Sequence, residues 1–327
     1  MKVLLLQKMD HAGMKILEDA GMQVDIPADA SEEGLGSCVA DYDAIIVRGM
    51  VKLPASVIQR AKKCKIISRH GVGLETIDVE AATKEHIPVA FTPGANANAV
   101  AEQAVSLMLD IMKKNCILSR KLMQEKDYQC RLGVMNSELR GKTVGIFGLG
   151  NIGRRVAEIV VWGFGAAVTG YDPYVSQERF AAMNLKGALT TDMDELLSKS
   201  DIITLHAPGS EVGMIDKRAI SLMREGAILI NTARGTLVDE PALYEALKSG
   251  HLAGAGLDVT ACEPPDPENP LFTLENVVAT PHTAALTKEG NVNMAIGAAE
   301  QVTGLLCEGK KPWGLANPAV WETRRME

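Results

Sequence analysis

The segment VGIFGLGNIG, residues 144–153, constrains the fold most, because three glycines in a GxGxxG pattern separate an apolar run from a helical one. In such a pattern Gly148 permits a tight turn, and Gly150 lets the backbone approach a pyrophosphate. Gly153 lets the helix pack closely on the strand, and the helix N-terminus then offers its amides to the anion. The segment therefore predicts a Rossmann unit that binds a dinucleotide. The expected cofactor-binding residues of this turn are Gly148, Gly150, Asn151, Ile152 and Gly153.

An acidic residue follows the next apolar run. Asp172 comes directly after residues 167–171, about 20 residues beyond the glycine pattern, where an acid accepts hydrogen bonds from the adenosine ribose hydroxyls. A carboxylate there also repels a 2′-phosphate, and no arginine immediately follows it. The sequence therefore favours NAD over NADP. The alternative is a purely structural strand-turn-helix in which Asp172 caps the turn.

Short apolar runs alternate with longer amphipathic stretches along the chain, which predicts an α/β fold with parallel sheets covered by helices. Two domains are expected for 327 residues, because domains usually run to about 100–200 residues. One long helical pattern starts at Asn98, continues past Arg120 and leads out of the first domain. The expected strands are 3–6, 44–47, 65–68, 88–91, 143–148, 167–171, 201–205, 227–231, 254–258 and 276–279. The expected helices also include 14–20, 54–61, 152–162 and 287–306, with an irregular tail after residue 310.

Charge and composition exclude several classes of partner. The formal net charge is −7 and no long basic run occurs, which disfavours binding to nucleic acid or to anionic membranes. No uncharged apolar stretch reaches the roughly 18 residues of a membrane span, and the N-terminal apolar run is shorter than the core of about 7–15 residues in a signal peptide. The six cysteines form no CxxC pair, so we expect reduced thiols in the cytoplasm and no metal site.

Three later segments each place a chemically useful side chain just past the carboxyl end of an expected strand, where ligands bind in open α/β sheets. They are Arg234 in NTARG, Glu263 in CEP and His282 in TPH. A guanidinium grips a carboxylate through two hydrogen bonds, and an imidazole can protonate a carbonyl oxygen. A carboxylate on the far imidazole nitrogen fixes the tautomer. Each residue alone is commonly a surface residue, but together they suit the reduction of a 2-oxo acid.

These motifs resemble one enzyme family. GLGNIG, NTARG, GAGLDV, EP and TPH occur in the order and approximate spacing of the D-isomer-specific 2-hydroxyacid dehydrogenases, and TPGANANAVAE and HGVGLETID extend the likeness over nearly the whole chain. The resemblance implies two Rossmann-like domains with the active site in the cleft. A discontinuous, flavodoxin-like substrate domain would comprise residues 1–98 and 285–327, and the NAD-binding domain residues 99–284. It also implies a homodimer formed through the NAD-binding domain, with residues 124–140 as an arm.

The resemblance also implies roles for individual residues. Arg234 would bind the substrate carboxylate, His282 would be the acid/base, and Glu263 would orient His282. Asp258 would bind the nicotinamide carboxamide. The other residues expected to line the cofactor are His206, Ala207, Pro208, Thr232 and Ala233. The residues expected to contact the substrate are Arg48, Arg69, Val72, Gly73, Asn96 and Arg234.

Two arginines in the first domain bear on the substrate. Arg48 follows residues 44–47, Arg69 precedes His70-Gly71-Val72-Gly73, and both match positions where phosphoglycerate dehydrogenases hold the substrate phosphate. Two guanidinium groups suit a phosphate dianion. We therefore expect 3-phosphoglycerate as substrate, in a member of the family without the C-terminal regulatory domain. Hydroxypyruvate or glyoxylate, lactate-like acids and sulfonated acids remain open.

A function of another class also stays open. An NAD-sensing binding protein or co-repressor can be built on the same fold, although the complete Arg/Glu/His set argues against it. A relative of the formate dehydrogenases is disfavoured, because those proteins typically carry Gln where Glu263 stands. The physiological direction of the reaction does not follow from the sequence.

Overall fold

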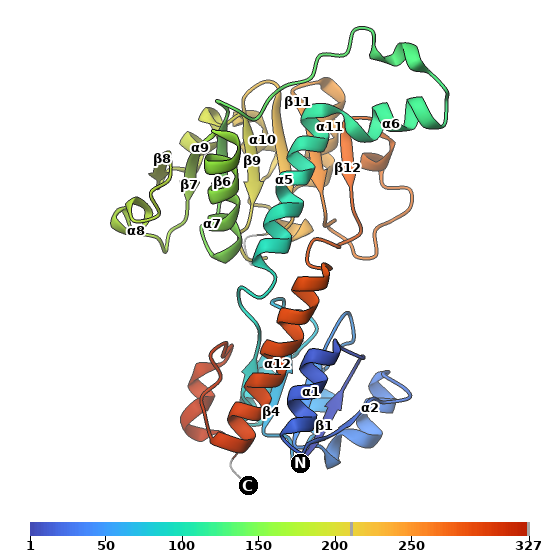
Figure 1. Ribbon diagram of the computed structural model, residues 1–327, viewed down its shortest axis with the longest axis vertical. Helices are drawn as coiled ribbons and strands as arrows, with labels where there is room; N and C mark the ends of the chain where they lie inside the picture. The colour runs from blue at the N-terminus through green and yellow to red at the C-terminus, as the bar shows by residue number, and fades with distance from the viewer. Residues whose placement is uncertain (210–211, 326–327) are drawn as a thin grey trace. The chain divides into compact units, whose positions relative to one another are not determined.

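The computed structural model of the chain describes residues 1–209 and 212–325 and divides into two compact units. The first unit joins Met1–Asn96 to Leu286–Glu327, and the second is Ala97–Ala285. Each unit is a parallel sheet covered by helices (Figure 1). The α/β class expected from the alternating pattern is confirmed.

The first unit contains a five-stranded sheet in the order β2-β1-β3-β4-β5, and all of its strand pairs are parallel. This is the flavodoxin-like order, in which the direction of strand succession reverses between β1 and β3. Ligands commonly bind at the carboxyl ends of the strands at such a reversal. The strands are β1 (Lys2–Leu5), β2 (Gln23–Asp25), β3 (Ala44–Val47), β4 (Ile66–Arg69) and β5 (Val89–Ala90).

Along the central strands, successive side chains point to opposite faces of this sheet. Ile46 of β3 packs in one apolar cluster with residues of α1 and α12, whereas Val47 packs in another with residues of α2, α3 and α4. Helix α12 lies beside α1 (Figure 1). The helices of the unit are α1 (His11–Asp19), α2 (Glu32–Cys38), α3 (Ala55–Ile58), α4 (Val79–Lys84) and α12 (Lys288–Glu308), with short 3-10 turns η1 (Val39–Asp41) and η6 (Pro318–Thr323).

The second unit contains a seven-stranded parallel sheet in the order β12-β11-β10-β9-β6-β7-β8. This is the Rossmann order with one further strand at its edge, and the succession reverses between β6 and β9. The strands are β6 (Thr143–Phe147), β7 (Ala167–Tyr171), β8 (Gly187–Thr190), β9 (Ile202–Leu205), β10 (Ala227–Asn231), β11 (Leu252–Leu257) and β12 (Val277–Ala279).

Helices cover both faces of the second sheet. Residues of α5 and α7 share one apolar cluster, and residues of α9, α10 and α11 share the other. The helices are α5 (Ala97–Lys113), α6 (Asn115–Met123), α7 (Asn151–Glu158), α8 (Gln177–Ala181), α9 (Met193–Lys199), α10 (Lys217–Leu222) and α11 (Glu240–Ser249). Shorter helical turns are η2 (Tyr128–Arg131), the π-helical η3 (Ile159–Gly163), η4 (Gly235–Leu237) and η5 (Pro270–Thr273).

The structure differs from the sequence-based expectation in three places. The long helix expected from Asn98 past Arg120 is two helices, because Lys114 adopts a left-handed conformation with φ 56° between α5 and α6. Strands β2 and β8 were not expected, because both lie at sheet edges and lack an apolar run. The C-terminal tail is not wholly irregular, since it contains η6. None of the helices in the described part of the chain is long and apolar enough to span a membrane.

Candidate active site

The carboxyl edge of the second sheet gathers most of the residues expected to have a function. All strands of this sheet are parallel, so the loops that follow them lie at one edge. The glycine turn follows β6, and β10, β11 and β12 are neighbours in the sheet. The residues in the loops after β7, β9, β10, β11 and β12 are Asp172, His206, Arg234, Glu263 and His282, respectively.

The glycine turn has the geometry that a dinucleotide needs. Gly148 has φ 85°, and a Cβ at this position would lie 2.7 Å from the His206 carbonyl oxygen. A Cβ at Gly153 would lie 1.9 Å from the Gly148 oxygen, so only glycine lets α7 start against the strand. Among the described residues, a Cβ at Gly150 would meet no atom within 4 Å, and no side chain caps the N-terminus of α7. The turn therefore leaves backbone amides and open space for a pyrophosphate.

Asp172 is held beside the glycine turn by two backbone amides. Its Oδ2 accepts a hydrogen bond from Leu149 N and its Oδ1 accepts one from Tyr174 N, each at 2.8 Å. The alternative reading of Asp172 as a turn cap thus describes part of what it does. A carboxylate has about four acceptor positions, so these two bonds orient it and still leave acceptors for ribose hydroxyls.

Two buried polar atoms near this edge have no hydrogen-bond partner among the described residues. They are Nδ1 of His206 and Oγ1 of Thr232. Burial lowers the pKa of His206 to about 3, so its ring is neutral, and Nε2 lies 3.0 Å from Thr204 Oγ1. A buried polar atom without a partner is costly, so both positions fit a site in which a bound cofactor supplies the missing partner. Ala207 and Pro208 continue the His206 loop.

His282 and Glu263 are in direct contact. His282 Nδ1 lies 2.7 Å from Glu263 Oε2, with 46% of the histidine side chain and 28% of the glutamate side chain exposed. This contact leaves Nε2 of the imidazole to exchange a proton with a ligand. The backbone of His282 is left-handed, with φ 52°, a conformation that costs energy in a non-glycine residue and is common at functional sites.

Asp258 holds the loop that carries His282. This residue is 1% exposed, and its Oδ1 accepts hydrogen bonds from Thr280 Oγ1 at 2.6 Å and from Thr283 N at 2.9 Å. Its Oδ2 accepts from Ala284 N at 2.9 Å. Neither this role nor the two threonines were expected from the sequence. A carboxylate buried directly after β11 must recruit nearby donors, and the threonines that flank His282 are the signal for it.

Hydrogen bonds between its own residues hold the loop that carries Arg234. The side chain of Asn231, which is 1% exposed, accepts from Ala233 N at 3.0 Å and donates to the Arg234 carbonyl at 2.8 Å. Arg234 Nη1 donates to the Ala233 carbonyl at 2.7 Å. A Cβ at Gly235 would lie 1.9 Å from the Thr260 carbonyl. Glycine at this position therefore lets the loops after β10 and β11 touch.

The first unit holds the remaining expected site residues. Arg48 follows β3 at the reversal of the strand order, and Arg69 ends β4 and donates from Nη1 to the Gly49 carbonyl at 2.9 Å. Val72 and Gly73 lie half-buried in the loop after β4. Asn96 is 9% exposed, and its buried Oδ1 has no partner within the described chain.

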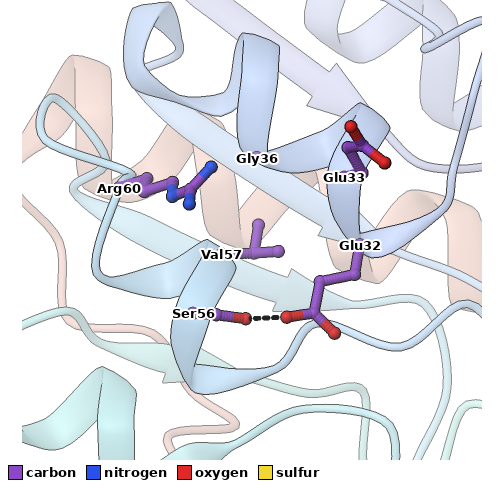
Figure 2. A pocket seen from close by; sticks show the side chains of 6 residues that line it. All are labelled: Glu32, Glu33, Gly36, Ser56, Val57 and Arg60. Carbon is purple, nitrogen blue, oxygen red and sulfur yellow. Dashed lines mark hydrogen bonds between the residues drawn. The ribbon is translucent and has the colours of Figure 1, made fainter.

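A hollow of about 290 Å³ also lies in the first unit, between α2 and α3 (Figure 2). Figure 2 shows Ser56 hydrogen-bonded to Glu32, with Arg60 beside Gly36. None of the residues expected to bind substrate or cofactor lines this hollow. It is therefore not part of the candidate site.

Comparison with known proteins identifies the family. Residues 105–284 match the model described as D-isomer specific 2-hydroxyacid dehydrogenase, NAD binding domain. The D-3-phosphoglycerate dehydrogenase of Archaeoglobus fulgidus is 41% identical over 307 residues, which are 93% of this chain and 57% of that protein. The chain belongs to the D-isomer-specific 2-hydroxyacid dehydrogenase family. The corresponding protein of Methanocaldococcus jannaschii is 40% identical over 311 residues, with the same coverage of each chain.

Solved structures agree with this membership in the D-isomer-specific 2-hydroxyacid dehydrogenases. The NAD⁺-bound 3-phosphoglycerate dehydrogenase of Entamoeba histolytica has a TM-score of 0.80 and 28% identity, covering 97% of this chain and 98% of that one. The structure of D-2-hydroxyisocaproate dehydrogenase has a TM-score of 0.85 and 27% identity, covering 97% and 100%. The expected family, its two-sheet fold and NAD as its cofactor are confirmed. The chain spans 57% of the length of the two archaeal relatives.

Proposed function

We propose that the chain interconverts a D-2-hydroxy acid and its 2-oxo acid, with NAD as the redox partner. The observation that carries this proposal is the 2.7 Å contact between His282 Nδ1 and Glu263 Oε2, at the same sheet edge as Arg234 and the glycine turn. Bound NAD supplies or accepts the hydride. The protein must then hold the substrate carboxylate and move one proton at the substrate oxygen.

Each part of that task has a residue suited to it. The Arg234 guanidinium pairs with the substrate carboxylate through two hydrogen bonds. His282 Nε2 donates a proton to the carbonyl oxygen during reduction and takes it back during oxidation. Glu263 accepts from Nδ1, which fixes the tautomer and stabilises the imidazolium. Asp258 keeps His282 in place, and we also propose that it receives the nicotinamide carboxamide.

Two variants test these roles separately. His282→Ala is expected to lower kcat by about 1000-fold or more and to leave NAD binding nearly intact, because only proton transfer is lost. Arg234→Ala is expected mainly to raise KM for the 2-oxo acid. Turnover at the wild-type rate in the His282 variant, or an unchanged KM in the Arg234 variant, contradicts the mechanism.

We propose 3-phosphoglycerate and 3-phosphohydroxypyruvate as the substrate pair. Relatives about 40% identical are named D-3-phosphoglycerate dehydrogenase, and Arg48 and Arg69 lie at the carboxyl edge of the first sheet. Rates with 3-phosphohydroxypyruvate, hydroxypyruvate, glyoxylate, pyruvate and 3-sulfopyruvate, each with NADH and NADPH, test the proposal. The phosphorylated acid with NADH should give the highest kcat/KM. An equal or higher value for any other acid contradicts it.

We further propose that the chain forms a homodimer through the second unit. Large apolar side chains are exposed on α6 and the segment after it, including Met123 at 67%, Leu132 at 67% and Met135 at 82%. We propose that these exposed apolar side chains belong to a surface that a second copy of the chain covers. Sedimentation should show a dimer, and Leu132→Glu with Met135→Glu should give a monomer. A wild-type monomer refutes this part of the proposal.

A further inference from the structure

At the carboxyl edge of the first sheet, Arg48 and Arg69 lie on opposite faces. In β3 and β4, Val47 is in register with Arg69, and side chains alternate between the two faces of the sheet. Arg48 therefore follows Ile46 onto the face covered by α12. His70 follows Ser68, whose hydroxyl donates to the Ala298 carbonyl of α12 at 3.1 Å. Arg48 and His70 thus meet the same helix.

The residue of α12 that Arg48 meets is Asn291. Arg48 Nη2 donates to Asn291 Oδ1 at 3.2 Å, and Arg48 Nη1 donates to the Lys8 carbonyl, in the loop after β1. Lys8 and Arg48 thus lie on the two sides of the strand reversal. These contacts use two of the five N–H donors of the guanidinium and fix its plane. Both acceptors are neutral, so the guanidinium keeps its positive charge, and its remaining N–H donors can face a ligand.

The orientation of the Asn291 amide is determined by its partners. Asn291 lies in the first turn of α12, and its Nδ2 donates to the Thr287 carbonyl at 2.9 Å. A carbonyl oxygen can only accept, so the amide nitrogen must face Thr287. The amide oxygen then points away from the helix end and accepts from Arg48. The N-cap of α12, where the Thr287 hydroxyl accepts from Gly290 N at 2.9 Å, supports the whole arrangement.

His70 fills the space beside this pair without adding charge. It is 4% exposed, and its Nε2 is buried without a partner among the described residues. Burial, and then the positive charge of Arg48, lowers the pKa of His70 to about 4, with a smaller contribution from Arg69. The carbonyl of Asn291 acts in the opposite direction. The imidazole is therefore neutral near pH 7, and Asn291 faces both it and Arg48.

We propose that Asn291 is a positioning residue that holds the Arg48 guanidinium ready for the anionic group at the far end of the substrate. This inference rests on the proposed function, in which Arg48 binds that group. Asn suits the task because its amide oxygen orients a guanidinium without neutralising it, whereas a carboxylate would occupy Arg48 with an ion pair. The neutral His70 adds no charge beside the Arg48 guanidinium.

Kinetics with two substrates that differ only in the phosphate test the inference. Asn291→Ala is expected to raise KM for 3-phosphohydroxypyruvate about tenfold, with kcat and the KM for hydroxypyruvate within about twofold of wild type. Asn291→Asp has nearly the same shape as wild type. It should raise the KM for 3-phosphohydroxypyruvate to about 100-fold above wild type, because its carboxylate competes with the phosphate. In Arg48→Ala, adding Asn291→Ala should have no further effect.

A matched control is available in the same helical turn. Asn293 is exposed, and its Nδ2 donates to the Ala95 carbonyl at 3.4 Å. Asn293→Ala should leave both KM values within about twofold of wild type. Equal changes for both substrates in Asn291→Ala, or no change for either, overturn the inference. The same holds if Asn291→Asp behaves like wild type.

A measurement without substrate separates this inference from the proposed function. The ¹⁵N–¹H heteronuclear NOE of the Arg48 Nε–Hε group, assigned by its absence in Arg48→Ala, should show an ordered side chain in wild type. It should show a mobile one in Asn291→Ala. If wild type does not prefer 3-phosphohydroxypyruvate, the substrate proposal fails and this NOE alone decides the role of Asn291. An Arg48 side chain that is as ordered in Asn291→Ala as in wild type overturns the inference, whatever the kinetics.

Discussion

Gly235→Ala should separate the two loops that carry Arg234 and Glu263. The new Cβ would lie 1.9 Å from the Thr260 carbonyl, whereas an ordinary contact begins at 3.4 Å, so the loops must part by about 1.5 Å. A misplacement of about 1 Å in an active site can cost about 100-fold in rate. We therefore expect kcat for the 2-oxo acid to fall by about 100-fold.

The assay compares initial rates of NADH oxidation with NADH binding followed by fluorescence. NADH binding should weaken much less than kcat falls, because the glycine turn that would hold the pyrophosphate follows β6, whereas the altered loops follow β10 and β11. Gly163→Ala is the matched control, since a Cβ at Gly163 meets no atom within 4 Å and the rate should not change. A folded Gly235→Ala protein with wild-type kcat would show that the distance between these loops does not matter for catalysis.

Three further predictions concern stability and cofactor choice. Asp258→Ala should lower the free energy of unfolding by about 2–4 kcal/mol in urea titrations, because the part-buried amide of Thr283 and the buried amide of Ala284 lose their acceptor. Asp172→Ser should raise kcat/KM with NADPH relative to NADH by about tenfold or more, and an unchanged ratio would contradict its proposed role. Between pH 7 and pH 5 an unfolded imidazole, with a pKa near 6.5, binds a proton, whereas folded His70, with a pKa of about 4, does not. The native state should therefore lose about 2 kcal/mol through this residue as the pH falls, and His70→Gln should lack that part of the loss.

The sheets were predictable wherever a strand is buried on both faces. Strand β3, AIIV, is an uninterrupted apolar run, and β10 is one up to the polar Asn231 at its end. The ends of both strands follow from the turn residues beside them. The edge strands β2, QVD, and β8, GALT, carry no such run, because part of each strand is exposed and does not need apolar side chains. No glycine or proline lies near Lys114, where the two helices are separated, so the helical pattern in the sequence continues through this position.

The candidate site was predictable as a set of residue types but not as a network. Arg234, Glu263 and His282 were recognisable because each follows a strand behind a dinucleotide fingerprint, and the contact between Glu263 and His282 was expected from their chemistry. The hydrogen bonds that Asp258 accepts from the His282 loop, and that Asn291 accepts from Arg48, join residues 25 and 243 positions apart in the chain. No local pattern specifies such pairs, because they depend on the register of the folded sheets and on where α12 packs.

The dehydrogenase activity is tested by adding 3-phosphohydroxypyruvate, and in parallel the four other 2-oxo acids named above, to the wild-type protein with NADH and following the loss of NADH absorbance. We expect 3-phosphohydroxypyruvate to give rapid oxidation of NADH and formation of the D-hydroxy acid, with a rate about 1000-fold or more lower in His282→Ala, which still binds NADH. If wild type binds NADH but oxidises it with none of the five 2-oxo acids, the proposed dehydrogenase activity is contradicted.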